Sequence, residues 1–195
     1  MDNVTNVLIV GVGGQGTLLA SKIIGTAALN HGCDVKQSEV HGMAQRGGSV
    51  VTFVRYGTKV YAPLVQKGTA DVVVAFEKLE ALRWADYLKP HGTIIVNDQE
   101  IAPLPVIIGA QSYPADSFQT LRDMQLNVVT ANALTLAKKA GEARAVNVVL
   151  MGVLAKFLSF SKVEWEKALL DVVPAKVIDV NMIAFEAGYN LEIGD

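Results

Sequence analysis

The 195-residue sequence predicts an α/β domain built on a mostly parallel β-sheet, and three observations lead to this prediction. Val7–Val10 is an unbroken apolar run, which is typical of a strand buried on both faces of a parallel sheet. A glycine-rich turn and an amphipathic helix follow this run. Further apolar runs then alternate with helical patterns, and such a rhythm indicates parallel strands joined by crossover helices.

The elements of the first half can be assigned in order. From Thr17 to Asn30 apolar residues recur at intervals of four, which predicts an amphipathic helix. The polar stretch 34–40 is a weaker strand candidate, and a glycine-containing loop follows over 41–48. The other expected elements of this half are a hairpin formed by 50–55 and 60–61, a strand at 71–76, a helix at 77–88 and strands at 93–96 and 106–108.

The second half is expected to be largely helical. After a short helix and one more strand, Gly141 ends a helix, and Ser161 and Glu164 have the spacing of a capping box. The expected elements are a helix at 116–124, a strand at 127–130 and helices at 133–140, 147–158, 163–172 and 176–189.

The length favours one domain, since domains average roughly 150 residues. We expect that domain to span residues 1–195, with a sheet core over 1–140 and a helical C-terminal segment over 141–195. Strands and helices in this alternation predict a Rossmann-like, doubly wound sheet with helices on both faces.

Composition excludes several classes of protein. The chain has 17 Lys and Arg against 19 Asp and Glu, a net charge of -2, so no basic surface for nucleic acid is indicated. Hydrophobic residues make up 51% and charged residues 18%, below the roughly 25% of an average soluble protein. We therefore expect part of the apolar surface to meet a partner protein.

The single cysteine, Cys33, cannot form an internal disulfide or supply the thiolates of an iron–sulfur cluster. The three histidines lack the spacing of metal ligands, so no metal site is expected in this chain. The N-terminal segment lacks the basic flank and apolar length of a signal peptide, and no run approaches the roughly 20 apolar residues of a membrane span. These observations predict a cytoplasmic protein without a membrane partner.

The turn after the first strand is the first candidate binding site. Its sequence, GVGGQG, fits the GxGxxG pattern between a strand and a helix, where backbone N–H groups can hold an anion at the helix N-terminus. Thr17 stands where a phosphate-binding loop of an NTPase would need lysine, which disfavours that class. The alternative is that the glycines only allow close packing of helix on sheet. The candidate cofactor-binding residues here are Gly11, Gly13, Gly14, Gln15 and Gly16.

Glu39 follows Gly16 by 23 residues, near the roughly 20 expected of the acidic residue that holds a ribose in a dinucleotide site. This spacing leaves open a free-standing NAD(P)-dependent oxidoreductase.

The loop HGMAQRGG, residues 41–48, is the second candidate. Its arginine can bind a phosphate or carboxylate through two hydrogen bonds, and its histidine can serve as a general base. The alternative is that Arg46 pairs with a carboxylate of this or another subunit. The residues that we single out are His41 and Arg46 as catalytic candidates and Gln45, Arg46 and Gly47 as cofactor-binding candidates.

Four segments together resemble one known family. GVGGQG at 11–16, EVHGMAQRGGSV at 39–50, NVVLMG at 147–152 and NMIAFEAGY at 181–189 resemble the gamma-type domain of 2-oxoacid:ferredoxin oxidoreductases, in the same order along the chain. The HGMAQRGG loop is the most specific of the four.

The resemblance implies a subunit of an enzyme that converts a 2-oxoacid, here an aryl one such as indolepyruvate, and coenzyme A into acyl-CoA and CO2 while ferredoxin is reduced. It implies that thiamine pyrophosphate and iron–sulfur clusters reside in a large alpha subunit, which would be the partner of this chain. Ferredoxin would be met through that complex. A non-catalytic scaffold subunit is the remaining alternative.

Overall fold

The computed structural model describes residues 4–42 and 48–193. Within these residues the chain forms one six-stranded sheet with the order β2-β3-β1-β4-β5-β6. The strands are β1 (Thr5–Val12), β2 (Asp34–His41), β3 (Ser49–Gly57), β4 (Ala70–Ala75), β5 (Leu88–Asn97) and β6 (Asn127–Ala131).

Strand β3 runs against the other strands of the described sheet. It pairs antiparallel with β1 on one side and with β2 on the other, whereas β1, β4, β5 and β6 pair parallel. The expectation of a mostly parallel sheet is therefore confirmed, with one reversed strand inserted between β1 and β2. Because β1 and β2 run in the same direction, their carboxyl ends lie at the same edge of the sheet.

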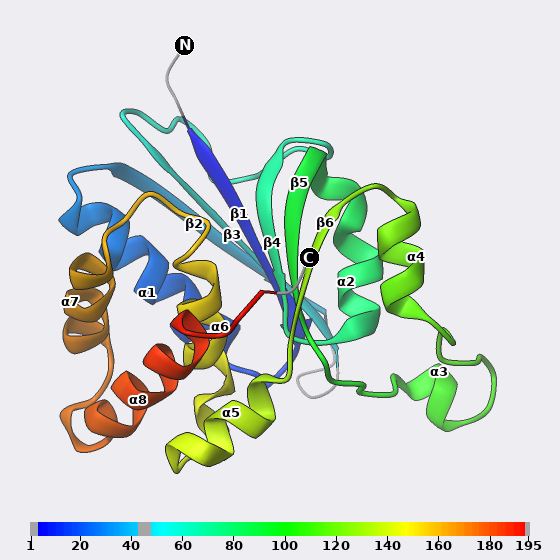
Figure 1. Cartoon of the computed structure of the whole chain (residues 1–195). Coiled ribbons are helices and arrows are strands. Elements are labelled where there is room, and N and C mark those ends of the chain that lie inside the picture. The colour runs from blue at the N-terminus through cyan, green and yellow to red at the C-terminus, as the bar shows by residue number, and fades with distance from the viewer. Residues whose placement is uncertain (1–3, 43–47, 194–195) are drawn as a thin grey trace.

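Helices cover both faces of the sheet (Figure 1). One face packs against the helices α1 (Thr17–Asn30), α5 (Ala133–Ala140), α6 (Val146–Leu154), α7 (Lys162–Val172) and α8 (Ile178–Tyr189). The other face is covered by the shorter helices α2 (Lys78–Trp84) and α4 (Ser117–Asp123). The doubly wound arrangement predicted from the sequence is therefore present. Four short helical turns complete the described chain: η1 (Ala85–Tyr87), α3 (Leu104–Ile107), η2 (Ala143–Ala145) and η3 (Ala175–Val177).

The alternation of side chains along each strand separates two cores. Val7 and Ile9 of β1 face the larger core under the C-terminal helices, while Leu8 and Val10 face the smaller core under α2 and α4. All four residues are fully buried. The apolar run of β1 thus serves both faces, as its sequence indicated.

Helices α6 and α8 approach closely through glycine. A Cβ added to Gly152 would lie 2.1 Å from the carbonyl oxygen of Phe185, and one added to Gly188 would lie 1.9 Å from that of Val149. These separations are far inside van der Waals contact, so the two backbones can meet only because both positions are glycine. The NVVLMG and NMIAFEAGY segments therefore build the packing of the helical layer.

Two predicted strand arrangements are wrong. Residues 106–108 were expected to form a strand, but Leu104–Ile107 forms the helix α3, since Pro103 and Pro105 favour the first turn of a helix and disfavour a central strand. The expected hairpin over 50–61 is absent from the described chain, because β3 instead pairs with β2 and β1.

Two helices are shorter than predicted. The one predicted over 77–88 ends at Trp84 and is followed by the turn η1 before β5 begins at Leu88. The one predicted over 147–158 ends at Leu154. The capping box of Ser161 and Glu164 is confirmed, with both of its hydrogen bonds formed at the start of α7.

Candidate functional site

The carboxyl ends of β1, β2 and β4 meet at one edge of the sheet, together with the start of β3. The glycine turn of residues 11–16 leaves β1 here and leads into α1. The end of β2 delivers His41, and the start of β3 delivers Ser49. The two loops singled out in the sequence therefore lie together, and the amide nitrogen of Gly13 donates to the carbonyl oxygen of Gly48 at 2.9 Å.

The last glycine of the turn, Gly16, sets the geometry at the start of α1. Its φ of 85° lies in the left-handed region, and a Cβ there would lie 2.6 Å from Nδ2 of Asn147. Asn147 is buried at the start of α6 and donates to the carbonyl oxygen of Gly16 at 3.5 Å. Asn147 thus holds the turn from the side of the helical layer.

Gln15 holds the turn together from within. Its Oε1 accepts a hydrogen bond from the backbone N–H of Val12 at 2.7 Å, and its Nε2 donates to the carbonyl oxygen of Phe76 at 3.0 Å. Nε2 also lies 3.3 Å from Oε1 of Gln99. The side chain of Gln15 is therefore engaged by the protein itself, and Gly11, at the end of β1, is buried behind it.

A pocket of about 560 Å³ opens between the two loops. This volume lies within the usual range of small-molecule sites. One apolar side chain in its lining, Leu18, is 51% exposed. The pocket is lined by Gly13, Gly14, Gly16, Thr17, Leu18, Glu39, His41, Gly42 and Val50.

Of the sequence candidates, Gly13, Gly14, Gly16 and His41 share this pocket, and His41 is exposed. Gln45, Arg46 and Gly47 lie outside the described residues. Of the neighbouring residues, Gly42 lines the pocket. Gly48 accepts a hydrogen bond from Gly13, which also lines it.

Glu39 lines the same pocket, as a ribose-binding carboxylate would, but one of its oxygens accepts a hydrogen bond from the hydroxyl of Thr52 at 3.0 Å.

Two buried carboxylates near this edge were missed by the sequence reasoning. Glu77 is the N-cap of α2, two residues after β4, and Glu80 lies in the first turn of α2. Each is 1% exposed. The hydroxyl of Ser49 donates to Glu80, whose other oxygen pairs with Arg83 at 2.5 Å. Ser49 thereby joins the end of the HGMAQRGG loop to α2. The spacing of Glu77 and Glu80 only indicated a helix start, so no sequence signal marked them as buried.

Glu77 is satisfied by three donors. One oxygen accepts from the backbone N–H of Glu80 at 3.0 Å, and the other accepts from the N–H of Ile101 at 3.1 Å and from the hydroxyl of Tyr113. Burial, and then the hydrogen bond to Glu77, raise the pKa of Tyr113 above its usual range. A buried carboxylate is tolerated only with such partners.

In the part of the chain that the structure covers, no group of three or more His, Cys, Asp or Glu side chains is placed to hold a metal ion. Burial raises the pKa of the half-buried Cys33 thiol, which fits a packing role. In the same ranges, no helix is both long and apolar enough to cross a membrane.

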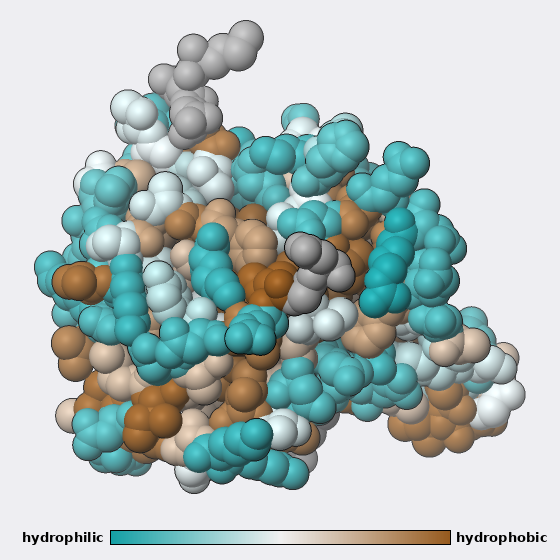
Figure 2. Space-filling model, in the orientation of Figure 1, coloured by the Kyte–Doolittle hydropathy of each residue, from teal (hydrophilic) through white to brown (hydrophobic). Residues whose placement is uncertain are grey.

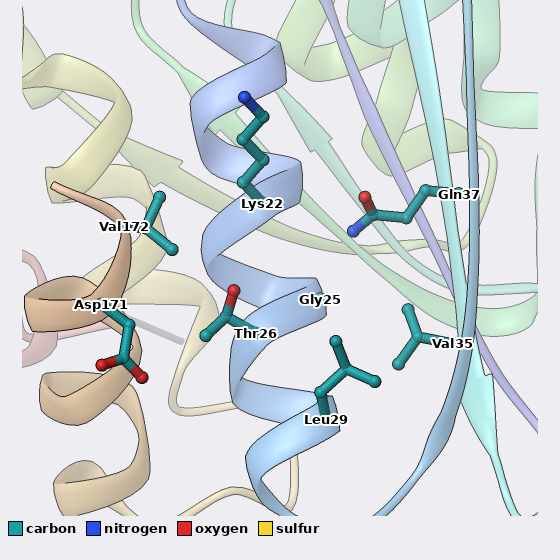
Figure 3. Close-up of a pocket in the computed structure, with 8 residues that line it drawn as sticks. All are labelled: Lys22, Gly25, Thr26, Leu29, Val35, Gln37, Asp171 and Val172. Carbon is teal, nitrogen blue, oxygen red and sulfur yellow. The ribbon is translucent and has the colours of Figure 1, made fainter.

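A second hollow, of about 490 Å³, lies across the exposed face of α1 (Figure 3). Gln37 reaches it from β2 and donates to the carbonyl oxygen of Ser21 at 2.6 Å, while Asp171 and Val172 come from α7. Its lining residues lie outside both loops that the sequence singled out.

Comparisons with known proteins show the family of this chain. The profile of the pyruvate ferredoxin/flavodoxin oxidoreductase family matches residues 6–191, nearly the whole chain. The chain belongs to this family of oxidoreductases. Within it, the chain is 42% identical over 192 residues to the indolepyruvate oxidoreductase subunit IorB of Archaeoglobus fulgidus, and the match covers 96% of this chain and 95% of the relative.

Two solved structures share the fold. The gamma subunit of a keto/oxoacid ferredoxin oxidoreductase from Geobacter sulfurreducens matches with a TM-score of 0.71 at 24% identity, over 95% of this chain and 96% of that one. A 2-oxoglutarate:ferredoxin oxidoreductase from Magnetococcus marinus, solved with 2-oxoglutarate, coenzyme A and succinyl-CoA bound, matches with a TM-score of 0.75 at 20% identity. That match covers all of this chain but 32% of the longer one.

Proposed function

We propose that this chain is the small subunit of an indolepyruvate:ferredoxin oxidoreductase. The complex would convert an aryl 2-oxoacid and coenzyme A into aryl-acetyl-CoA and CO2, with the electrons passing to ferredoxin. The observation that carries the proposal is the identity of 42% to a named indolepyruvate oxidoreductase subunit, over nearly the full length of both chains. The pocket between the glycine turn and the HGMAQRGG loop is where we place its contribution.

The pocket suits a site completed by another chain. It opens at the surface between two loops, and its lining includes Leu18, an apolar side chain that is 51% exposed. An exposed apolar side chain at an open pocket fits a surface that another protein covers. The large subunit, in this proposal, covers the pocket.

The cofactors are assigned to the two chains by their chemistry. One cysteine cannot supply the thiolates of an iron–sulfur cluster, so we assign the clusters to the large subunit. Thiamine pyrophosphate is assigned to the large subunit because the family resemblance implies it. Thiamine pyrophosphate supplies the carbanion chemistry of decarboxylation when it is bound there.

Coenzyme A is the ligand that this chain's residues fit. The backbone N–H groups at the start of α1 and the guanidinium of Arg46 can hold its phosphates. His41 lines the same pocket and is exposed, so it is placed to contact the reacting end of a bound ligand.

The test is reconstitution with the large subunit and measurement of dye reduction that depends on indolepyruvate and coenzyme A. We expect activity only when both chains are present. Arg46→Ala is expected to raise the KM for coenzyme A or lower kcat by at least about tenfold, since a charge-assisted pair is worth roughly 1.5–3 kcal/mol. Arg122→Ala, an exposed arginine on α4, is the matched control and should leave both constants unchanged.

Two results would overturn the proposal. Full activity of the large subunit without this chain would make it a scaffold. Saturable binding of a nicotinamide nucleotide by the isolated chain, lost on Glu39→Ala, would instead establish the free-standing NAD(P)-dependent oxidoreductase.

A further inference from the structure

The chain between β5 and α4 leaves the body of the molecule as a separate projection, which we call the arm (Figure 1). The arm spans residues 101–115 and contains the four-residue helix α3. It begins after β5, so it departs from the same edge of the sheet that holds the glycine turn and the pocket.

The surface of the arm is apolar. None of its fifteen residues is charged in the sequence, and Leu104, Ile107 and Ile108 are 67%, 69% and 68% exposed. Figure 2 shows hydrophobic residues gathered where Figure 1 places α3. Burial of large apolar side chains is favourable, so three of them left in water form a surface suited to association.

The arm nevertheless has a defined shape of its own. The carbonyl oxygen of Pro105 accepts from the N–H groups of Ala110 and Gln111, at 2.8 and 3.0 Å, and the carbonyl oxygen of Leu104 accepts from Ile108 at 3.0 Å. These bonds close the arm on itself. Pro103 and Pro105 also restrict its unbound conformations, which lowers the entropy lost on binding.

Both ends of the arm are tied to one buried carboxylate. Glu77 accepts from the N–H of Ile101 at the start and from the hydroxyl of Tyr113 near the end. The same tyrosine oxygen accepts from the N–H of Leu79 in α2 at 3.1 Å. The arm is therefore fixed relative to the sheet edge and the pocket.

Charge indicates the kind of partner that the arm fits. The charged residues nearest to the arm in sequence are Glu100 and Asp116, both acidic and exposed. The arm itself carries no lysine or arginine, the residues that segments binding an anionic membrane or a nucleic acid commonly use. An apolar groove on another protein is the surface that remains.

We propose that the arm is a docking element that inserts Leu104, Ile107 and Ile108 into an apolar groove of the large subunit. This inference rests on the proposed function, which supplies the partner. It is also supported by the name of the relative from Archaeoglobus fulgidus, a subunit of an indolepyruvate oxidoreductase, since a subunit implies a partner chain. Because arm and pocket share one edge of the sheet, the subunit that covers the pocket is placed to receive the arm.

The test is the affinity between the two purified subunits, measured by titration calorimetry. We expect the triple variant Leu104→Ala, Ile107→Ala and Ile108→Ala to bind the large subunit at least about 100-fold more weakly, since all three apolar anchors of the contact are truncated. Its circular dichroism and Tm should match the unaltered chain, because these side chains are exposed. The matched control is Val163→Ala, Leu170→Ala and Ile183→Ala, which are 72%, 61% and 56% exposed on α7 and α8.

The outcomes separate this inference from the proposed function. If the unaltered chain binds and the arm variant binds equally well, the docking role is wrong while the small-subunit function stands. If the unaltered chain does not bind the large subunit at all, the proposed function fails first. Binding of the unaltered chain, but not the arm variant, to vesicles of phosphatidylglycerol and phosphatidylcholine would overturn the choice of a protein partner.

Discussion

Helix α6 and the arm are both strongly apolar, yet the fold treats them in opposite ways. From Asn147 to Leu154 every residue of α6 is buried, whereas Leu104, Ile107 and Ile108 of the arm are each about two-thirds exposed. The difference lies in what covers them, since α6 lies under α8 and against the sheet, while the arm extends beyond both. Apolar sequence in this chain therefore serves two purposes, internal packing and association.

The largest effect is expected from a substitution that disrupts the close packing of α6 against α8. Gly188→Ala places a methyl group 1.9 Å from the carbonyl oxygen of Val149, a rigid backbone atom. We expect a loss of about 3 kcal/mol in the free energy of unfolding, at the upper end of overpacking effects. Chemical denaturation measures it.

A control at another helical glycine separates overpacking from the substitution itself. Gly25→Ala in α1 would meet the amide nitrogen of Gln37, the far end of a flexible side chain. The gain in helix propensity, about 1 kcal/mol, should offset the lost hydrogen bond from Gln37 to Ser21. Equal losses at Gly25 and Gly188 would contradict the account of the α6–α8 contact.

A smaller loss of stability is expected when the hydrogen bond between Tyr113 of the arm and Glu77 is removed. Tyr113→Phe removes the hydroxyl that donates to Glu77 and accepts from Leu79, which should reduce stability by about 1–2 kcal/mol. We expect amide hydrogen exchange to accelerate in residues 101–113 and to stay unchanged in α6. Tyr61→Phe, an 83% exposed tyrosine, is the control. Uniform acceleration over the whole chain would show that Tyr113 supports the fold rather than the arm.

The smallest effect expected is a change in how the stability of the fold depends on pH, and it arises from Glu164 in α7. The hydrogen bond with the His31 ring, and then those with Ser161, lower the pKa of Glu164 to about 2. A lowered carboxyl pKa stabilises the fold above the ordinary value near 4.5, and this contribution is lost as the pH falls from there toward 2. Glu164→Gln should therefore flatten the acid limb of a stability–pH curve. An unchanged acid limb would show that Glu164 does not contribute to the pH dependence of stability.

Much of the fold followed from local pattern. The apolar run of β1, the glycine turn, the position of α1 and the capping box at Ser161 are each determined by residues close in sequence. The predicted strand at 106–108 failed because β-branched residues there favoured a strand, while the flanking prolines start a short exposed helix. The hairpin failed because the partner of β3 is β2, which local turn chemistry cannot reveal.

The candidate site was only partly predictable for the same reason. Gly16 and His41 could be singled out because a turn and a loop of unusual composition carry them. Glu77 and Asn147 act through contacts with residues 24 and 131 positions away. Such contacts depend on the assembled sheet, and nothing in the local sequence distinguishes these side chains from ordinary helix starts.

Hydrogen exchange of this chain, alone and in complex with the large subunit, tests directly whether the sheet edge and its arm face the partner. We predict that binding slows exchange in the glycine turn, at the end of β2 and in the arm, and leaves exchange in α7 nearly unchanged. Protection confined to α7 and α8, with the sheet edge unchanged, would contradict the claim that this edge and its arm face the partner.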